Sequence, residues 1–217
     1  MHVLAVVVVS GPHVLEPLAG APPVVRSVRA APGVPGVARV AVLAPDALLG
    51  AVRAACAGER TTTHGASTLL PGAHGGQRPE GSPGDGPITA GAADVVLVLD
   101  AARPFVPADL GARVVDAVRA GRGAVVPVLP LSDTVKLTDA GRVTATPDRA
   151  ALRVVQTPQG FAPAHLDAVL AAALADPLGA WTGAPGPVHT VPGDPLAFAV
   201  HDAWHRDLAR ATVQEEP

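Results

Sequence analysis

The sequence predicts an α/β fold in which a mostly parallel sheet is covered by helices on both faces. Short apolar runs that end in small or polar residues recur along the chain, at residues 2–9, 37–43 and 95–99. Such runs are typical of strands buried on both faces. Helical patterns lie between them, and this alternation is typical of a three-layer α/β protein. The length of 217 residues fits a single domain, residues 1–217.

The composition narrows the classes of function. Hydrophobic residues make up 48% of the chain, enough for a core, and the formal net charge is −3 with Lys and Arg scattered. This charge balance argues against a nucleic-acid-binding face and against a basic membrane patch. The single cysteine, Cys56, excludes an internal disulfide and a cysteine-built metal site. Its apolar, helix-like surroundings predict a buried small residue.

We interpret residues 2–9 as the first buried strand rather than as a signal peptide. No basic region precedes this apolar run, and the run is too short to span a bilayer. We therefore expect a cytoplasmic protein. The turn Ser10-Gly11-Pro12-His13 follows the strand, at the position where α/β proteins often carry a phosphate-binding loop. This turn contains one glycine and no Lys or Arg.

The middle of the chain contains a long segment without a regular pattern. Three predicted elements come before it: a helix at 22–29, a strand at 37–43, and a helix that Asp46 caps and that runs to about residue 57. From residue 72 to residue 91, ten of twenty residues are Gly or Pro. This density predicts a flexible loop over 72–91.

The strand at 95–99 ends at two charged residues, Asp100 and Arg103. In an open α/β sheet, ligands bind at the carboxyl ends of the strands. The Arg103 guanidinium can offer a fork of donors to a phosphate or a carboxylate. The alternative interpretation is a strand end capped by an Asp–Arg pair on a turn.

The second half of the chain continues the strand and helix pattern, apart from one polar segment. The predicted elements are a helix at 107–120 with Gly121 as its C-cap, a strand at 123–128, a helical turn at 149–152, a strand at 154–157, a helix at 163–174, a loop at 177–187, a strand at 188–191 and a helix at 202–213. The polar segment, residues 134–146, predicts a β-hairpin around a glycine turn. An isolated hairpin is marginally stable, so it needs a partner surface.

Three motifs, in this order, carry a resemblance to a known family. They are Asp100-Ala-Ala-Arg103-Pro104, Asp133-Thr-Val-Lys136 and Gln156-Thr-Pro-Gln-Gly-Phe161. With them the chain resembles the 2-C-methyl-D-erythritol 4-phosphate cytidylyltransferase family, as a divergent member. The resemblance implies a nucleotide-diphospho-sugar transferase-like, Rossmann-related fold. It also implies cytidylyl transfer from CTP to methylerythritol phosphate with release of pyrophosphate, Mg²⁺ as the cofactor, and a homodimer in which the hairpin arm reaches into the second subunit.

The resemblance assigns five residues to the substrate site. Asp100 and Arg103 line the site at the strand end, and Asp100 is also the candidate Mg²⁺ ligand. Thr157 contacts the same substrate, while Thr134 and Arg149 reach it from the partner's arm. The residue types fit this role, because hydroxyl and guanidinium groups recognise a phosphate-bearing polyol.

The nucleotide side departs from the family pattern. The family has a glycine-rich loop with an arginine and then a Pro-Lys pair; here the shorter stretch 10–17 replaces both and leaves Ser10 and Gly11 as its remnant. Residues 1–25 contain no Lys or Arg, and Ala199 stands where the family has a lysine. Removing one electrostatic stabiliser of this kind typically costs ~10²–10³ in rate. We therefore expect weak or lost activity; the alternative is a non-catalytic dimeric homologue with a sugar-phosphate-binding or regulatory role.

Three further residues have more than one interpretation. Lys136 lies two residues beyond Thr134 on the same side of a strand, so it either assists the site or is a solvated hairpin lysine. Catalysis would survive only if His13, or Arg78 in a trace of a family segment, compensates for the missing cations. Imidazole is mostly neutral at pH 7, and the alternative for His13 is a loop histidine without a role.

Overall fold

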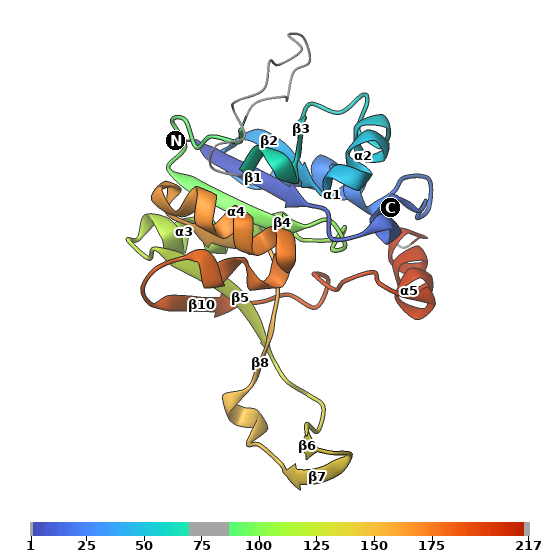
Figure 1. Ribbon diagram of the computed structural model, residues 1–217, viewed down its shortest axis with the longest axis vertical. Helices are drawn as coiled ribbons and strands as arrows, with labels where there is room; N and C mark the ends of the chain where they lie inside the picture. Colours follow the sequence, from blue (N-terminus) through green and yellow to red (C-terminus); the bar gives the residue numbers. More distant parts are fainter. Residues whose placement is uncertain (1, 70–86, 215–217) are drawn as a thin grey trace.

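The computed structural model describes residues 2–69 and 87–214 and contains one large mixed sheet (Figure 1). The strands along the sheet lie in the order β10–β5–β9–β4–β1–β2–β3, and β8 pairs with β5 outside this row. Their bounds are β1 (Val3–Val8), β2 (Val37–Ala44), β3 (Thr62–Gly65), β4 (Val95–Asp100), β5 (Ala124–Pro130), β8 (Arg153–Val155), β9 (Gln159–Phe161) and β10 (Val188–Pro192). The four strands from β3 to β4 run parallel, as do β5 and β10.

Helices cover both faces of this sheet, which confirms the predicted three-layer α/β fold. Alternate residues of β1 point to opposite faces, as strand geometry requires. Val3, Ala5 and Val7 pack in one core cluster with side chains of α1 (Pro23–Ala30), α2 (Leu49–Ala55) and α3 (Ala108–Arg119). Leu4, Val6 and Val8 pack in a second cluster with α4 (Leu166–Ala175). The last helix, α5 (Ala203–Gln214), lies at the right-hand end of the view in Figure 1.

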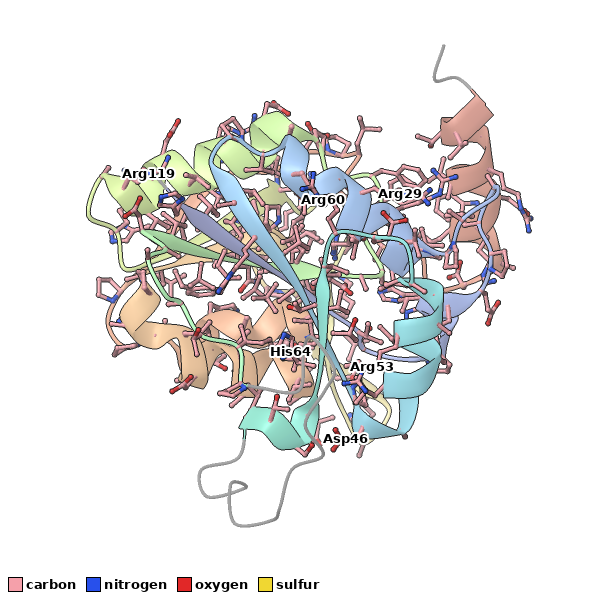
Figure 2. The ribbon with its side chains drawn as sticks, turned by 90° about the horizontal axis from the view of Figure 1, so that it is seen from above. Arg29, Asp46, Arg53, Arg60, His64 and Arg119 are labelled. Atoms are coloured by element: carbon pink, nitrogen blue, oxygen red, sulfur yellow. The ribbon has the colours of Figure 1, made fainter. Side chains whose placement is uncertain are left out.

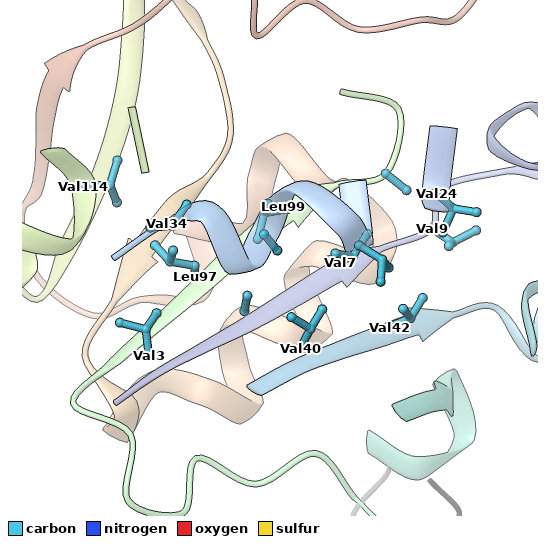
Figure 3. Packing of buried hydrophobic residues seen from close by; sticks show 14 of the residues in the cluster. Val3, Val7, Val9, Val24, Val34, Val40, Val42, Leu97, Leu99 and Val114 are labelled. Carbon is cyan, nitrogen blue, oxygen red and sulfur yellow. The ribbon is translucent and has the colours of Figure 1, made fainter. Parts of the chain in front are cut away.

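The first cluster is built from branched aliphatic side chains. Figure 3 shows Val3 and Val7 of β1 in one layer with Leu97 and Leu99 of β4, while Val24 of α1 lies at the right of the view, next to Val9. β-branched residues fit a pleated surface that is buried on both faces. Cys56 is buried in this cluster as well, as its surroundings predict.

The sheet contains one antiparallel strand in its middle that the sequence pattern does not predict. The predicted strand at 154–157 is β8, which ends at Val155; β9 then starts at Gln159 and inserts between β4 and β5, antiparallel to both. Gly160 allows β9 to pack closely against α3, because a Cβ at this position would lie 2.5 Å from Val114 Cγ1 of that helix. The short β9 segment lacks the apolar run by which a buried strand is recognised.

The structure adds one strand and corrects two other predictions. Residues 62–65 form an edge strand, β3, which the pattern misses because its residues are mostly polar. Asp46 does not cap a helix; its carboxylate accepts hydrogen bonds from the backbone N–H and the hydroxyl of Ser67. Part of the predicted loop at 177–187 is a 3₁₀ helix, η8 (Pro177–Gly183). Most of the loop predicted at 72–91 lies outside the described residues.

A hairpin is present where the sequence predicts one. Strands β6 (Leu137–Asp139) and β7 (Arg142–Ala145) pair around Gly141, whose φ is +78°, and they extend away from the body of the molecule (Figure 1). We call residues 132–153, which include this hairpin, the arm. Leu137 and Val143 on the arm are 53% and 63% exposed. In the isolated chain the arm therefore presents apolar side chains to solvent, which is typical of a surface that contacts a partner.

Within residues 2–69 and 87–214, no helix combines the length and the apolar character needed to cross a membrane.

Candidate functional site

The parallel pairing of β1 and β4 places Asp100 beside the turn that follows β1. Val8, the last residue of β1, is in register with Asp100, the last residue of β4. The Asp100 side chain folds back on the chain, and its Oδ1 accepts the Ala102 N–H at 2.9 Å. This aspartate turn ends the strand locally. It leaves the Asp100 carboxyl buried, only 3% exposed, at the carboxyl edge of the sheet.

Arg103 lies beside Asp100 and is also buried. Its Nε is 3.8 Å from Asp100 Oδ2, and its Nη1 donates to the carbonyl oxygen of Ala197. Nε itself is buried without a hydrogen-bond partner. Burial raises the pKa of the Asp100 carboxyl, against the opposing effects of the Ala102 N–H and of the Arg103 charge. Burial also lowers the pKa of Arg103, so for both groups desolvation outweighs their mutual attraction.

The segment between β8 and β9 brings Thr157 and Gln156 to the same edge. Thr157 Oγ1 accepts the backbone N–H of Asp100 at 3.1 Å, and the Thr157 side chain is fully buried. The Gln156 amide reaches the other way, to residues 193–197. Its Oε1 accepts the Asp194 N–H at 2.9 Å, and its Nε2 donates to the Asp194 carbonyl oxygen at 2.7 Å.

The turn after β1 makes three contacts with α5 (Ala203–Gln214) and with the residues just before it. It forms a 3₁₀ helix, η1 (Pro12–Leu15). The His13 ring lies 5.3 Å from the His201 ring, centroid to centroid, and Glu16 forms an ion pair with Arg206. Leu18 packs in a small apolar cluster with Val200 and Ala209. These contacts connect the turn after β1 to residues 200–209.

The electrostatics of this turn disfavour a charged histidine. Burial, followed by the neighbouring His201, lowers the pKa of His13; Arg206 acts in the same direction, while Asp100 and Glu16 oppose it. His13 therefore supplies no positive charge near neutral pH. The Nε2 atom of His13 is buried without a hydrogen-bond partner.

The arm residues lie elsewhere in the single chain. Thr134, Lys136 and Arg149 are exposed on the arm, which points away from the sheet (Figure 1). Lys136 Nζ donates to Thr146 Oγ1 at 2.7 Å, and Arg149 Nη1 donates to the Ser132 carbonyl oxygen at 3.1 Å. One chain therefore joins Asp100 with Arg103 and Thr157 but does not bring Thr134 or Arg149 to them.

Among the described residues, charged side chains form no metal cluster. No group of three or more His, Cys, Asp or Glu in this part of the chain is arranged to hold a metal ion. Figure 2 shows labelled arginines on separate elements: Arg29 on α1, Arg53 on α2 and Arg119 at the end of α3. Arg78 lies outside the described residues.

Comparison with known proteins identifies the family. Residues 9–215 match the family model described as IspD: 2-C-methyl-D-erythritol 4-phosphate cytidylyltransferase. The chain belongs to the IspD family. A 2-C-methyl-D-erythritol 4-phosphate cytidylyltransferase of Rhodococcus jostii is 40% identical over 181 residues, which cover 82% of this chain and 76% of the relative. A bifunctional IspD/IspF enzyme of Clavibacter michiganensis is 41% identical over 205 residues, 92% of this chain and 49% of the relative.

The fold agrees with solved IspD structures. The crystal structure of 2-C-methyl-D-erythritol 4-phosphate cytidylyltransferase from Thermus thermophilus superposes with a TM-score of 0.64 at 27% identity, covering 99% of this chain and all of the other. A synthase structure from Anaerococcus prevotii gives a TM-score of 0.70 at 19% identity and supports the fold alone. The predicted nucleotidyltransferase-like fold is thus confirmed, and this chain is a homologue of IspD cytidylyltransferases.

The sequence did not predict the hydrogen bonds and the ion pair that connect distant segments of this IspD-family chain at the edge of the sheet. Gln156 stands next to Thr157 in a recognised motif, so its position was a usable signal. Ala197 contributes only its carbonyl oxygen, which no side-chain pattern reveals. Glu16 and Arg206 are 190 residues apart in sequence, so only the fold brings them together.

Proposed function

We propose that this IspD-family chain binds 2-C-methyl-D-erythritol 4-phosphate but transfers the cytidylyl group of CTP weakly or not at all. One observation carries the proposal: residues 1–25 lack Lys and Arg. In addition, His13 and Glu16 in the turn after β1 contact His201 and Arg206 of the same chain. The alternative, a non-catalytic dimeric homologue with a sugar-phosphate-binding or regulatory role, is the limit in which turnover is zero and binding remains.

The substrate half of the site is supported by residues already held in place. Asp100, Arg103 and Thr157 are buried at one sheet edge and connected by hydrogen bonds or charge. Thr134 and Arg149 are exposed on the arm and reach this edge only from a second copy of the chain. A homodimer joined by its arms would therefore complete a site of hydroxyls and guanidinium groups, which suits a phosphate-bearing polyol.

The nucleotide half lacks the charge that the reaction requires. A phosphate oxygen of methylerythritol phosphate attacks the α-phosphorus of CTP, and the bond to the pyrophosphate leaving group breaks. The protein contributes mainly positioning and positive charge around the phosphates. Arg103 belongs to the substrate half, Arg206 is paired with Glu16, and the lowered pKa of His13 keeps that ring neutral.

Mg²⁺ is the cofactor that the family resemblance implies, but Asp100 is poorly placed as a resident ligand. Its carboxylate is buried, one oxygen accepts the Ala102 N–H and the other faces Arg103. Mg²⁺ keeps several waters and is usually held by one or two carboxylates together with substrate phosphates. The described residues therefore do not fit a preformed Mg²⁺ site at Asp100.

The cytoplasmic location inferred from the sequence stays a prediction.

The test is a pyrophosphate-release assay with CTP, Mg²⁺ and methylerythritol phosphate, with the Rhodococcus jostii relative measured in parallel. Loss of several phosphate-stabilising cations predicts a rate lower by at least ~10²–10³ in this chain. A rate within about tenfold of the relative, roughly 1.4 kcal/mol in barrier, would contradict the proposal. It would instead favour an ordinary cytidylyltransferase with replacement residues.

A further inference from the structure

We propose that Gln156 is a positioning residue that fixes the guanidinium of Arg103 toward a phosphate-bearing ligand, acting through the carbonyl oxygen of Ala197. The ligand in this inference rests on the proposed function. The orientation of Arg103 rests on the geometry of the chain alone.

Gln156 holds residues 193–197 with both ends of its amide. The side chain is 2% exposed. Oε1 accepts the Asp194 N–H at 2.9 Å, and Nε2 donates to the carbonyl oxygens of Asp194 at 2.7 Å and Ala197 at 3.4 Å. Gly193 leaves room for this amide, because a Cβ at that position would collide with Gln156 Oε1. The segment is therefore fixed by a buried, fully engaged amide, which makes its position sensitive to any change at residue 156.

Arg103 depends on the same carbonyl oxygen. Its Nη1 donates to Ala197, while its Nε has no hydrogen-bond partner and lies 3.8 Å from the nearest Asp100 oxygen. That Nε distance is too long for a hydrogen bond. The hydrogen bond to Ala197 is thus the directional contact that sets the plane of the guanidinium. A second tie, from the Val200 N–H to the Ala102 carbonyl oxygen at 2.8 Å, brings this segment to the chain beside Arg103.

The consequence is a chain of contacts from Gln156 through Ala197 to Arg103. Bidentate recognition of a phosphate depends on the angle of the guanidinium fork. A small displacement of a positioned group costs far more than its local energy suggests. A change at Gln156 should therefore weaken phosphate recognition although Gln156 itself does not contact the ligand.

The test compares two buried glutamines of the same segment. Gln156→Glu keeps the shape and the acceptor for Asp194, but it replaces the donor to Asp194 and Ala197 by a carboxylate oxygen. Gln159→Glu is the matched control. Gln159 is fully buried and its amide is also engaged at both ends, with Leu178 at 2.7 Å and Trp181 at 3.1 Å, so it holds η8 rather than residues 193–197.

The first readout is the NMR signal of the Arg103 Nε–H, assigned by its disappearance in Arg103→Lys. Gln156→Glu should move or broaden this signal, and Gln159→Glu should leave it in place. The second readout is the Kd for methylerythritol phosphate by calorimetry. Loss of one hydrogen bond between a displaced Arg103 and the ligand predicts up to about tenfold weaker binding in Gln156→Glu. In Gln159→Glu we expect a change within about twofold. In an Arg103→Lys background, Gln156→Glu should add little, because the coupled pair is already broken.

Gly193→Ala provides a second variant should Gln156→Glu fail to fold. It displaces the Gln156 amide from the opposite side without adding a charge, and the same shift of the Arg103 signal is expected. An unchanged Arg103 signal in both variants, or equal effects from the two glutamines, overturns the positioning role. If wild-type protein gives no heat with methylerythritol phosphate, the proposed function fails, but the NMR comparison still decides the role of Gln156.

Discussion

Several buried polar groups at the carboxyl edge of the sheet have hydrogen-bond partners far away in sequence. The Asp100 N–H finds the Thr157 hydroxyl 57 residues later, and Gln156 finds Asp194 after 38 residues. A buried donor left without a partner costs about 1–3 kcal/mol. The edge is therefore held rigid by a few specific hydrogen bonds, and it can present Asp100 and Arg103 in fixed positions.

Thr157→Ala tests this at one residue. The variant leaves the Asp100 N–H buried and unpaired, so the free energy of unfolding should fall by about 1–3 kcal/mol. Thr157→Ser keeps the hydroxyl and is the control, with a smaller loss. Urea denaturation of the three proteins provides the comparison, and equal loss in Ala and Ser would show that the hydrogen bond contributes little.

His13 should give stability a measurable pH dependence. Its folded-state pKa is lowered from the ordinary value of 6.5 by burial and then by His201, with Arg206 acting likewise and Asp100 and Glu16 opposing. A lowered histidine pKa contributes stability that is present above pH 6.5 and is lost as the pH falls through the folded-state value. The wild-type protein should therefore lose more unfolding free energy between pH 7.5 and pH 5 than His13→Gln.

The comparison with His13→Gln isolates this effect from that of Asp100. The raised pKa of Asp100 acts with the opposite sign, because its contribution to stability decreases as the pH rises from the ordinary carboxyl range toward the raised value. Parallel stability curves for wild type and His13→Gln would show that His13 is solvated and not buried as described.

Among single residues, the sequence predicted those with a motif and missed those without one. Asp100, Arg103 and Thr157 stand in recognisable strings, and the structure brings them together at one edge. The role of Ala197 depends on its backbone, and that of Arg206 on a contact with the turn after β1. Such contacts arise from the folded path of the chain and leave no local signature.

Among the elements, β9 depends on a single small residue. It lies antiparallel between β4 and β5 and packs under α3, where a Cβ on Gly160 would lie 2.5 Å from Val114 Cγ1 and 2.8 Å from Val118 Cγ2. Because the segment from β8 to β9 carries Gln156 and Thr157, the depth of β9 in the sheet sets the position of both side chains.

Gly160→Ala should therefore destabilise the fold by about 1–3 kcal/mol, the usual cost of overpacking a core. Gly50→Ala on α2 is the matched control, since a Cβ there meets nothing within 4 Å; it should be neutral or stabilise by roughly 0.5–1 kcal/mol through helix propensity. Thermal unfolding of both variants measures the difference. Equal melting temperatures would contradict the close packing of β9 against α3.

The predictability of the elements follows the length of their apolar patterns. Strands β1, β2, β4 and β5 are long apolar runs and helix α3 carries a helical period, and all five were predicted close to their observed bounds. Strands β3 and β9 are four and three residues long, too short for a period to appear. The antiparallel insertion of β9 depends on contacts with β4 and β5, so its place in the sheet was not available from its own residues.

For the whole molecule, the arm is the feature that a single chain does not explain. It extends from the body with Leu137 and Val143 exposed (Figure 1), and it carries Thr134 and Arg149 away from Asp100. Pairing with a second copy would cover the apolar side chains and complete the substrate site in one step. The proposed homodimer would therefore link assembly to binding.

Leu137→Asp together with Val143→Asp should convert the dimer to a monomer, because two charges would have to be buried at the arm contact. Trp181→Gln removes an exposed apolar side chain from η8 on the body and is the control. Sedimentation equilibrium measures the masses. A monomeric wild-type protein, or a double variant that stays dimeric, would contradict the proposal that the arm mediates dimerisation.

The most direct test of the account is calorimetric titration of the wild-type protein with methylerythritol phosphate and, separately, with CTP and Mg²⁺. We predict saturable heat with methylerythritol phosphate, reduced at least about tenfold in affinity by Arg149→Ala on the arm, since an Arg–phosphate contact is charge-assisted. We predict little or no heat with CTP and Mg²⁺, because residues 1–25 contain no Lys or Arg and Arg206 is paired with Glu16. Tight CTP binding, or no binding of methylerythritol phosphate, would contradict the claim that the substrate half of this site is kept and the nucleotide half is lost.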